Sequence, residues 1–247
     1  MERLEVLDSR SRWKLQRAIL SSFLIDYFSS TQERIHVLEA GCGTAWNLDL
    51  GTLDFVLTGL DVSEEALELR QHQQNDLDEI VVGDLQTIEL SDAQYDMIYC
   101  SYVLEHVSGA EEVLNKLFRW LKPNRLLVLL IPDRDTVLGF ITRCTPFWSH
   151  VFFYKYIRRL PNAGKPGQVP FQTYYDKVVS RRGIHDYCRS RGHKILLEYG
   201  HAFNSSRTFG VFAPLLDILL KLIELISFRR LSSDHSGLVY VIEKSPQ

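Results

Sequence analysis

The stretch that decides the fold is Val37-Leu38-Glu39-Ala40-Gly41-Cys42-Gly43-Thr44. Its apolar first half is typical of a buried strand. The Gly-x-Gly that follows predicts a tight turn in which the backbone approaches a ligand closely, because glycine has no Cβ and tolerates positive φ. A dinucleotide fingerprint would need a third glycine three positions after the second, where Trp46 stands instead. The turn alone therefore leaves a ligand site and a purely structural turn equally open.

Four more apolar runs follow at regular spacing. They are Phe55-Val56-Leu57 before Leu60-Asp61-Val62, Ile80-Val81-Val82 before Gly83-Asp84-Leu85, then residues 95–101 and residues 125–132. Nearly continuous apolar runs are expected of strands in a parallel sheet that is covered by helices on both faces. Asp61 would then lie at the tip of the second strand, where an acidic side chain can accept hydrogen bonds from a ribose.

In this order and spacing, the motifs resemble those of class I S-adenosylmethionine (SAM)-dependent methyltransferases. The likeness is to the broad type 11-like group, which carries an element like Leu104-Glu105-His106-Val107 after the fourth strand. It covers residues 35–133. The resemblance implies an α/β fold with a Rossmann-like seven-stranded sheet, helices on both of its faces, and SAM as the cofactor.

The resemblance also implies which residues hold the cofactor. The Gly-x-Gly turn would support the methionine part, Asp61 and Val62 would contact the ribose and the adenine, and residues 83–85 would meet the adenine edge. Cys100 and Ser101 would line the methionine site. The complete predicted set is Glu39, Gly41, Cys42, Gly43, Thr44, Asp61, Val62, Gly83, Asp84, Leu85, Cys100 and Ser101.

We expect one domain over residues 1–247, with two inserts. The first spans residues 134–180, after the fifth strand, and the second spans residues 201–237, between the sixth and seventh strands. Residues 193–199 and 238–243 have the pattern of those last two strands. By the resemblance, the final strand would lie antiparallel beside the fifth.

Helical patterns cover residues 12–28, 64–74, 110–121 and 181–191. Ser63 and Ser108 directly precede two of these segments and are predicted N-caps, since a serine hydroxyl can accept a hydrogen bond from a first-turn N–H. Residues 45–52 lack a helical pattern, which predicts a truncated helix after the first strand.

Charge is distributed unevenly along the chain. Residues 1–133 hold 11 Lys and Arg against 23 Asp and Glu, a net charge of −12, and residues 134–247 hold 17 against 8, a net charge of +9. A basic half beside an active site favours an anionic acceptor or surface, and a solvated basic face without a partner is the alternative. No nucleic-acid module is found, so sequence-specific nucleic-acid binding is not expected.

The first insert is predicted to be a substrate lid, because segments after the fifth strand lie at the carboxyl edge of the sheet, where ligands bind. Its aromatic residues are interleaved with Arg and Lys, which suits a flat or sugar-like acceptor that bears phosphate. The predicted substrate-binding residues are Trp148, His150, Tyr154 and Arg158. A small satellite core of aromatic residues is the alternative.

The second insert contains an apolar stretch, residues 209–228, that is nearly long enough to span a bilayer. Asp217, Lys221 and Glu224 share one helical face near its middle, which argues against spanning, and Pro214 marks the first helical turn. Two interpretations remain open. The helix packs on the protein or in a homodimer, or it contacts a membrane surface peripherally.

His106 is the best candidate for a catalytic base, because it follows the fourth strand beside the cofactor site and histidine titrates near neutrality. His150, His185 and His201 are weaker candidates. A purely structural role for His106 is equally open. Some relatives bind a divalent ion through Glu-x-x-Glu-His, but Tyr102 replaces the first carboxylate here, so no metal is expected.

The sequence therefore predicts SAM-dependent O-methylation of a small or lipid-linked acceptor, with a glycan precursor preferred. A membrane-associated lipid or quinone-type methyltransferase is the first alternative, and a non-catalytic binding protein with this fold is the second. Four scattered cysteines without Cys-x-x-Cys and no signal-peptide pattern predict a cytoplasmic protein, or one at the inner membrane face if residues 209–228 contact lipid.

Overall fold

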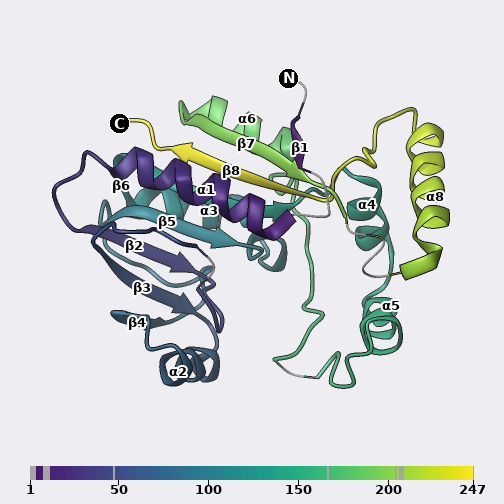
Figure 1. The fold of residues 1–247 in the computed structure, drawn as a ribbon, viewed down its shortest axis with the longest axis horizontal. Coiled ribbons are helices and arrows are strands. Elements are labelled where there is room, and N and C mark those ends of the chain that lie inside the picture. Colours follow the sequence, from purple (N-terminus) through teal and green to yellow (C-terminus); the bar gives the residue numbers. More distant parts are fainter. Residues whose placement is uncertain are drawn as a thin grey trace.

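The computed structural model describes residues 4–7, 12–46, 48–165, 167–203, 205 and 209–246. They form an eight-stranded sheet with the strand order β1-β7-β8-β6-β5-β2-β3-β4 (Figure 1). The strands are β1 (Val6–Leu7), β2 (Ile35–Ala40), β3 (Phe55–Asp61), β4 (Glu79–Val82), β5 (Tyr95–Ser101), β6 (Leu121–Pro132), β7 (Lys194–His201) and β8 (Gly237–Glu243).

All neighbouring strands are parallel except β8, which is antiparallel to both β6 and β7. This topology confirms the predicted Rossmann-like sheet with a reversed final strand. The eighth strand is β1, which forms the edge of the sheet and pairs with β7 through Val6 and Gly200, and the Gly200 N–H donates to the carbonyl of Glu5 over 2.8 Å. A strand of two residues is too short to show an alternating or apolar pattern in the sequence.

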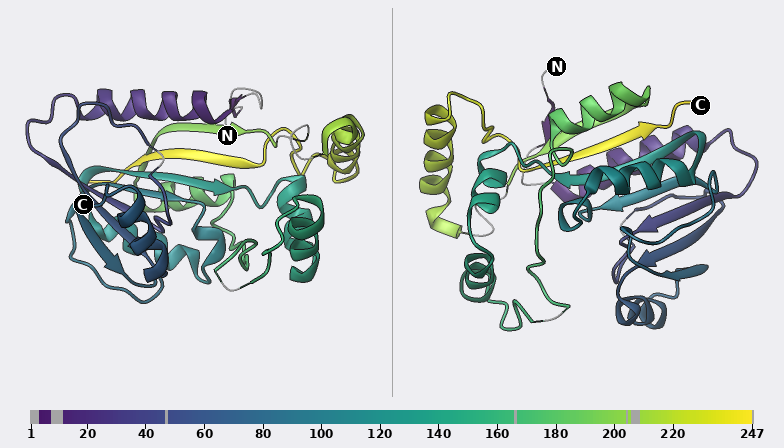
Figure 2. Two further views of the ribbon diagram at one scale, coloured as in Figure 1. Left: turned by 60° about the horizontal axis from the view of Figure 1, so that its bottom comes forward. Right: turned by 180° about the vertical axis from the view of Figure 1, so that it is seen from behind.

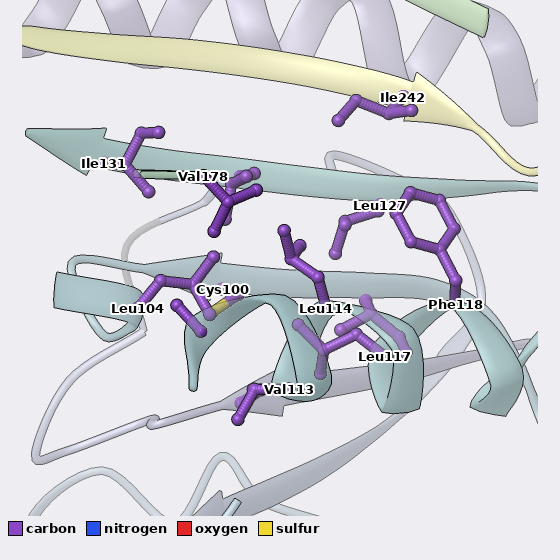
Figure 3. Packing of buried hydrophobic residues seen from close by; sticks show 14 of the residues in the cluster. Cys100, Leu104, Val113, Leu114, Leu117, Phe118, Leu127, Ile131, Val178 and Ile242 are labelled. Atoms are coloured by element: carbon purple, nitrogen blue, oxygen red, sulfur yellow. The ribbon is translucent and has the colours of Figure 1, made fainter. Parts of the chain in front are cut away.

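Helices cover the two faces of the sheet and enclose two separate cores. On one face, α1 (Arg12–Phe28) and α2 (Glu64–Gln73) bury Leu20, Leu24 and Leu67 against the strands. On the other face, α3 (Ala110–Trp120) and α6 (Arg181–Arg191) pack on the sheet, and Figure 3 shows side chains of α3 against those of β5 and β6. The predicted helices are therefore present with bounds within one residue of those expected.

One of the two predicted N-caps is confirmed. Ser63 caps α2, and its hydroxyl accepts a hydrogen bond from the N–H of Ala66 over 3.2 Å. The prediction for Ser108 is wrong, because Gly109 (φ 75°) is the N-cap of α3 and Asp176 accepts from the N–H of Ala110 over 2.8 Å. The first turn of α3 is thus capped by a carboxylate from a distant segment and not by the hydroxyl of the preceding serine.

The truncated helix expected after the first strand is absent from the described residues. Between Gly41 and Asp54, the described residues form turns and irregular backbone without a helix. This leaves the region beyond the carboxyl end of β2 covered only by a loop.

The two inserts form a separate group of short helices beyond the carboxyl ends of the strands (Figures 1 and 2). The first insert contains α4 (Val137–Cys144), α5 (Phe147–Phe152) and the π-helix η2 (Phe153–Ile157). The second contains the 3-10 helix η3 (Gly210–Phe212) and α8 (Ala213–Ile226), whose first turn holds Pro214 as predicted. Among the helices described, none has the length and apolar character needed to cross a membrane.

Candidate active site

The Gly-x-Gly turn lies where β2 ends, and a different structural requirement favours glycine at each of the two positions. Gly41 (φ +71°) needs the space, because a Cβ there would lie 2.3 Å from Val103 Cγ2. Gly43 (φ +55°) faces open space, with no heavy atom of the described residues within 4 Å of a Cβ built on it. The first glycine lets the turn pack on the segment after β5, and the second leaves room for a ligand.

Asp61, at the end of β3, holds this turn. Its Oδ2 accepts from the N–H of Gly43 over 2.8 Å, and its Oδ1 accepts from the N–H of Ser63 over 2.9 Å. A carboxylate oxygen has more than one acceptor site, so both oxygens can still accept from ribose hydroxyls. The next residue, Val62, is 70% exposed and offers an apolar surface beside the carboxylate.

Glu39 acts on the turn through a buried arginine. Arg70 of α2 is fully buried, and its Nη1 donates to Glu39 Oε2 over 2.6 Å and to the Cys42 carbonyl over 3.2 Å. Asp76 binds the other side of the guanidinium, at 2.9 Å from Nη2. Burial raises the pKa of Glu39, and the attraction of Arg70 opposes that rise. This network fixes the backbone of the turn from behind.

The other predicted cofactor residues divide by side-chain direction. Asp84 lies after β4 with partial exposure and accepts from the N–H of Gln86, and Leu85 is buried beside it. The Cys42 and Cys100 side chains are buried in the two cores, and Figure 3 shows Cys100 among the side chains packed between β5 and α3. Cys100 can therefore reach a cofactor only through its backbone.

The remaining members of the predicted set lie along the same edge. Thr44 is exposed, and its carbonyl accepts from Gln74 Nε2 over 2.8 Å. Gly83 lies against Ile88, where a Cβ would come within 2.4 Å of the Ile88 side chain. Ser101 ends β5 and is half-buried. The ends of β2, β3, β4 and β5 thus bring the predicted set together around one edge of the sheet.

A cavity of about 730 Å³ lies next to this edge, between the sheet and the inserts. Its walls come from the segment after β5, the ends of β6 and β7, and the helices α4, α5, η2 and α8. Most of the lining is aliphatic or aromatic, including Leu138, Ile141, Phe153, Phe171, Phe203 and Leu216. The cavity meets the predicted cofactor edge at Tyr102, Glu105 and His106.

Three of the four predicted substrate-binding residues line this cavity. They are His150, Tyr154 and Arg158, and the Arg158 guanidinium lies 5.6 Å from the centre of the Tyr154 ring. Trp148 does not line the cavity and is 70% exposed, because α5 turns the opposite face toward it. Trp148 thus lies on the same helix as His150 but on a face turned away from the cavity, and its predicted role in substrate binding stays a prediction.

His106 lies on the cavity wall in a defined tautomer. Its Nδ1 is 2.8 Å from the carbonyl oxygen of Gln172, which can only accept, so Nδ1 carries the proton and Nε2 of the neutral ring has a free lone pair. Burial lowers the pKa of His106. The neutral ring is therefore present at neutral pH and can accept a proton at Nε2.

Glu105, which precedes His106, also lies on the cavity wall. It is only 4% exposed, and its Oε2 has no hydrogen-bond partner among the described residues. Burial raises its pKa to about 8, so the carboxyl group is neutral at pH 7. Its Oε1 is 3.8 Å from His106 Nε2, too far for a hydrogen bond, so Gln172 and not Glu105 orients the imidazole.

The Tyr102 hydroxyl lies 2.7 Å from Nε2 of His201, and both side chains line the cavity. His185 is bound to Glu198 at 2.9 Å and is not among the lining residues. Across the part of the chain that is described, no group of three or more His, Cys, Asp or Glu side chains is placed to hold a metal ion.

Comparison with known proteins decides the family. A family profile described as "Methyltransferase domain" matches residues 12–198, which is more than half of the 247 residues. The chain belongs to this methyltransferase-domain family. The domain is of the SAM-dependent class, as the resemblance at residues 35–133 implied.

Curated relatives of the methyltransferase domain are distant. Demethylmenaquinone methyltransferase of Listeria welshimeri is 27% identical over 145 residues, covering 54% of this chain and 57% of the relative. An uncharacterized 37.1 kDa protein in transposon TN4556 of Streptomyces fradiae is 32% identical over 108 residues, covering 40% and 31%. The chain thus spans between about a third and somewhat over half of the length of these two relatives.

Solved structures with the same fold include the YcgJ protein from Bacillus subtilis, with a TM-score of 0.56, 14% identity, and coverage of 93% of this chain and 100% of that one. The [4+2]-cyclase SpnF has a TM-score of 0.54 at 15% identity, covering 99% and 86%. The plantazolicin methyltransferase BpumL, in complex with S-adenosylhomocysteine (SAH), has a TM-score of 0.53 at 16% identity, covering 96% and 86%. These likenesses establish the fold.

The residues of the methyltransferase domain fit SAM as its cofactor. The space in front of Gly43, the remaining acceptor sites of Asp61 and the exposed Val62 lie together at the carboxyl ends of β2 and β3. These features offer, in turn, room for a ligand against the backbone, partners for ribose hydroxyls and an apolar contact for a base.

Proposed function

We propose that this protein transfers the methyl group of SAM to an oxygen of a small or lipid-linked acceptor bound in the cavity between the sheet and the inserts. One observation carries the proposal. The segment from Tyr102 to His106 follows β5 at the predicted cofactor edge and also forms part of the cavity wall. An acceptor in the cavity would therefore lie next to the cofactor, with residues 134–180 as its lid.

SAM supplies an electrophilic methyl group on its sulfonium when bound. The protein has to align the acceptor with this group and limit its contact with water, and a cavity between the sheet and the inserts serves both needs. His106 would take the hydroxyl proton of the acceptor at Nε2, while Gln172 holds the proton on Nδ1. The neutral carboxyl group of Glu105 would donate a hydrogen bond to a polar group of the acceptor, which satisfies its buried oxygen.

The lining favours an acceptor with a substantial apolar part. Phe153, Leu216 and Leu220 form part of the wall, and the charged group of Arg158 adds a contact for an anionic group such as phosphate. A lipid-linked glycan precursor meets both conditions. A lipid or quinone-type acceptor is the second candidate, favoured by the same apolar walls and by the similarity to demethylmenaquinone methyltransferase.

Thermal unfolding with SAM and with SAH tests the cofactor site. At 100 times its Kd, a ligand stabilises the folded protein by about 2.7 kcal/mol, a rise of roughly 5–10 °C in Tm for a domain of this size. We expect this rise in the wild type and in Asp92→Ala, which alters an exposed carboxylate before β5, and its loss in Asp61→Ala. A wild type that binds neither ligand would favour the non-catalytic binding protein.

Methyl transfer from radiolabelled SAM to lipid and aqueous extracts then tests the acceptor class. The proposal expects label in the organic phase, and a product stable to mild base would distinguish an ether from a carboxyl ester. Label that stays only in water-soluble products would exclude the lipid-linked acceptor.

A further inference from the structure

Helix α8 exposes an apolar face on the outside of the protein. With about 100° between successive residues, its apolar exposed residues share an arc of roughly 120° opposite the buried Ala213 and Leu220. These residues are Leu215, Ile218, Leu219, Leu222, Leu225 and Ile226. Asp217, Lys221 and Glu224 lie beside the buried line and not within this arc. A surface helix normally turns its polar side outward, so an outward aliphatic face indicates a surface that binds something.

A second exposed apolar group lies on the first insert. Trp148 and Phe152 of α5 and Tyr156 and Ile157 of η2 are exposed and do not line the cavity, whereas His150 and Phe153 do. Phe153 contacts Phe209, at 6.0 Å between ring centres, and so joins the two inserts. Figure 2 shows α5 and α8 at the same end of the molecule, beyond the sheet.

Basic residues accompany these apolar groups. Residues 136–175 contain Arg143, Lys155, Arg158, Arg159 and Lys165 and no acidic residue, and α8 is followed directly by Arg229 and Arg230. Lys155, Arg158, Arg159, Arg229 and Arg230 are all exposed. An apolar surface with cations along it is complementary to a bilayer with anionic headgroups, where aliphatic side chains enter the acyl region and cations meet phosphate.

We propose that α8 and the exposed side of α5 and η2 form a docking surface for an anionic lipid bilayer. Trp148 and Tyr156 are of the residue types that favour the membrane–water boundary. A second copy of the chain fits less well, because a two-fold contact would bring the same exposed basic residues face to face.

The docking surface and the cavity share a wall, and this step rests on the proposed function. Leu219 is 51% exposed on the outward face of α8 and also lines the cavity, together with Leu216 and Leu220. An acceptor with a lipid tail can therefore pass from the bilayer along α8 into the cavity without its apolar part crossing water. Docking itself requires no methyl transfer and is tested without SAM.

Co-sedimentation with vesicles provides the test, using phosphatidylcholine alone and phosphatidylcholine mixed with phosphatidylglycerol. The central variant is Ile218→Asp/Leu222→Asp, which alters two outward residues that do not line the cavity. Leu69→Asp is the matched control, because Leu69 is an exposed leucine on α2. Unchanged Tm and an unchanged SAH-induced rise in Tm would show that each variant is folded.

We expect the wild type and Leu69→Asp to bind the mixed vesicles, and the double variant to bind roughly a hundredfold more weakly, since each of the two aliphatic side chains contributes about tenfold when buried. Arg229→Gln/Arg230→Gln should weaken binding to the mixed vesicles only, and salt should do the same. Failure of the wild type to bind either vesicle would overturn the proposal. So would a dimer, seen without lipid in analytical ultracentrifugation, that Ile218→Asp/Leu222→Asp dissociates.

Discussion

The predicted cofactor edge and the inserts place their charged and apolar side chains in opposite ways. At the cofactor edge the charges are inside, where Arg70 is fully buried between Glu39 and Asp76, and Asp61 accepts from the turn with one oxygen and from the Ser63 N–H with the other. In the inserts the apolar side chains are outside, on α8 and α5, with arginine and lysine along them.

The difference agrees with what each region is proposed to bind. Directional contacts fix a backbone to within a fraction of an ångström, which suits a cofactor that must be held in one position. Helices packed through small apolar contacts can vary in length and position around an acceptor. Each of the following substitutions should therefore affect one region and spare the other.

The largest effect is expected for Arg70→Met. It leaves the carboxylate of Glu39 buried without a partner and should lower the free energy of unfolding by about 3–5 kcal/mol. Urea denaturation measures this loss. Arg34→Met is the control, because Arg34 pairs with exposed Asp54 and should cost less than about 1 kcal/mol. Equal losses in the two variants would contradict the structural role of the buried network.

His106→Gln should lower kcat by about 10²-fold or more and leave SAH binding and Tm unchanged, because a base acts only on the proton. In the wild type the neutral imidazole is the active form. Since burial lowers the pKa of His106, kcat should be constant through neutral pH and fall only below the ordinary value of 6.5. His72→Gln, at an exposed position of α2, is the control. A pH profile that is the same in His106→Gln and in the wild type would exclude this role.

Glu105→Gln should stabilise the protein at high pH. The folded state keeps the Glu105 proton up to about pH 8, whereas an unfolded glutamate releases it near pH 4.3, so the stability of the wild type falls as pH rises between these values. The amide removes this dependence. The gain relative to the wild type should be about 1–3 kcal/mol larger at pH 8 than at pH 5. Parallel stability curves for the two proteins would show that Glu105 is ionised in the fold.

Gly43→Ala and Gly41→Ala separate stability from binding. Both force alanine into positive φ, at about 1 kcal/mol, but only Gly41→Ala also pushes against Val103. Gly43→Ala should therefore keep most of its stability and lose SAH affinity in calorimetry, whereas Gly41→Ala should lower Tm and regain part of it when combined with Val103→Ala. Unchanged SAH affinity in Gly43→Ala would mean that the open space is not the cofactor site.

The smallest effect is expected for Trp148→Ala. The side chain is exposed and outside the cavity, so Tm and the kcat/KM for a water-soluble acceptor should be within experimental error of the wild type. Tyr154→Ala, on the cavity wall, should raise KM. Loss of activity in Trp148→Ala would return this residue to the substrate site.

Much of the sheet could be predicted from the sequence because its central strands, such as β5 and β8, are buried on both faces and therefore almost continuously apolar. The run 95–101 coincides with β5 from end to end. Side-chain direction could not be predicted in the same way. Cys100 and Glu105 are close in the sequence, yet one side chain enters the core and the other reaches the cavity, and that choice depends on the backbone after β5.

Contacts between distant segments also could not be predicted from the sequence pattern. Asp176 caps α3 from 66 residues away, and β1 adds to the sheet through only two residues. The cavity wall combines α4 and α8, which belong to different inserts, so its apolar character became visible only once the two were placed together. Local periodicity predicts elements well, and it carries no information on which of them will meet.

The position of β8 has a consequence for how the protein is made. In the sheet β8 lies between β6 and β7, but along the chain it follows both. During synthesis β2 to β6 can assemble as soon as they leave the ribosome, while β7 and β1 must wait for a strand that emerges some 36 residues after β7 ends. The growing chain therefore holds an open apolar edge on β6 until then, and an unpaired edge of this kind can pair with the edges of other chains.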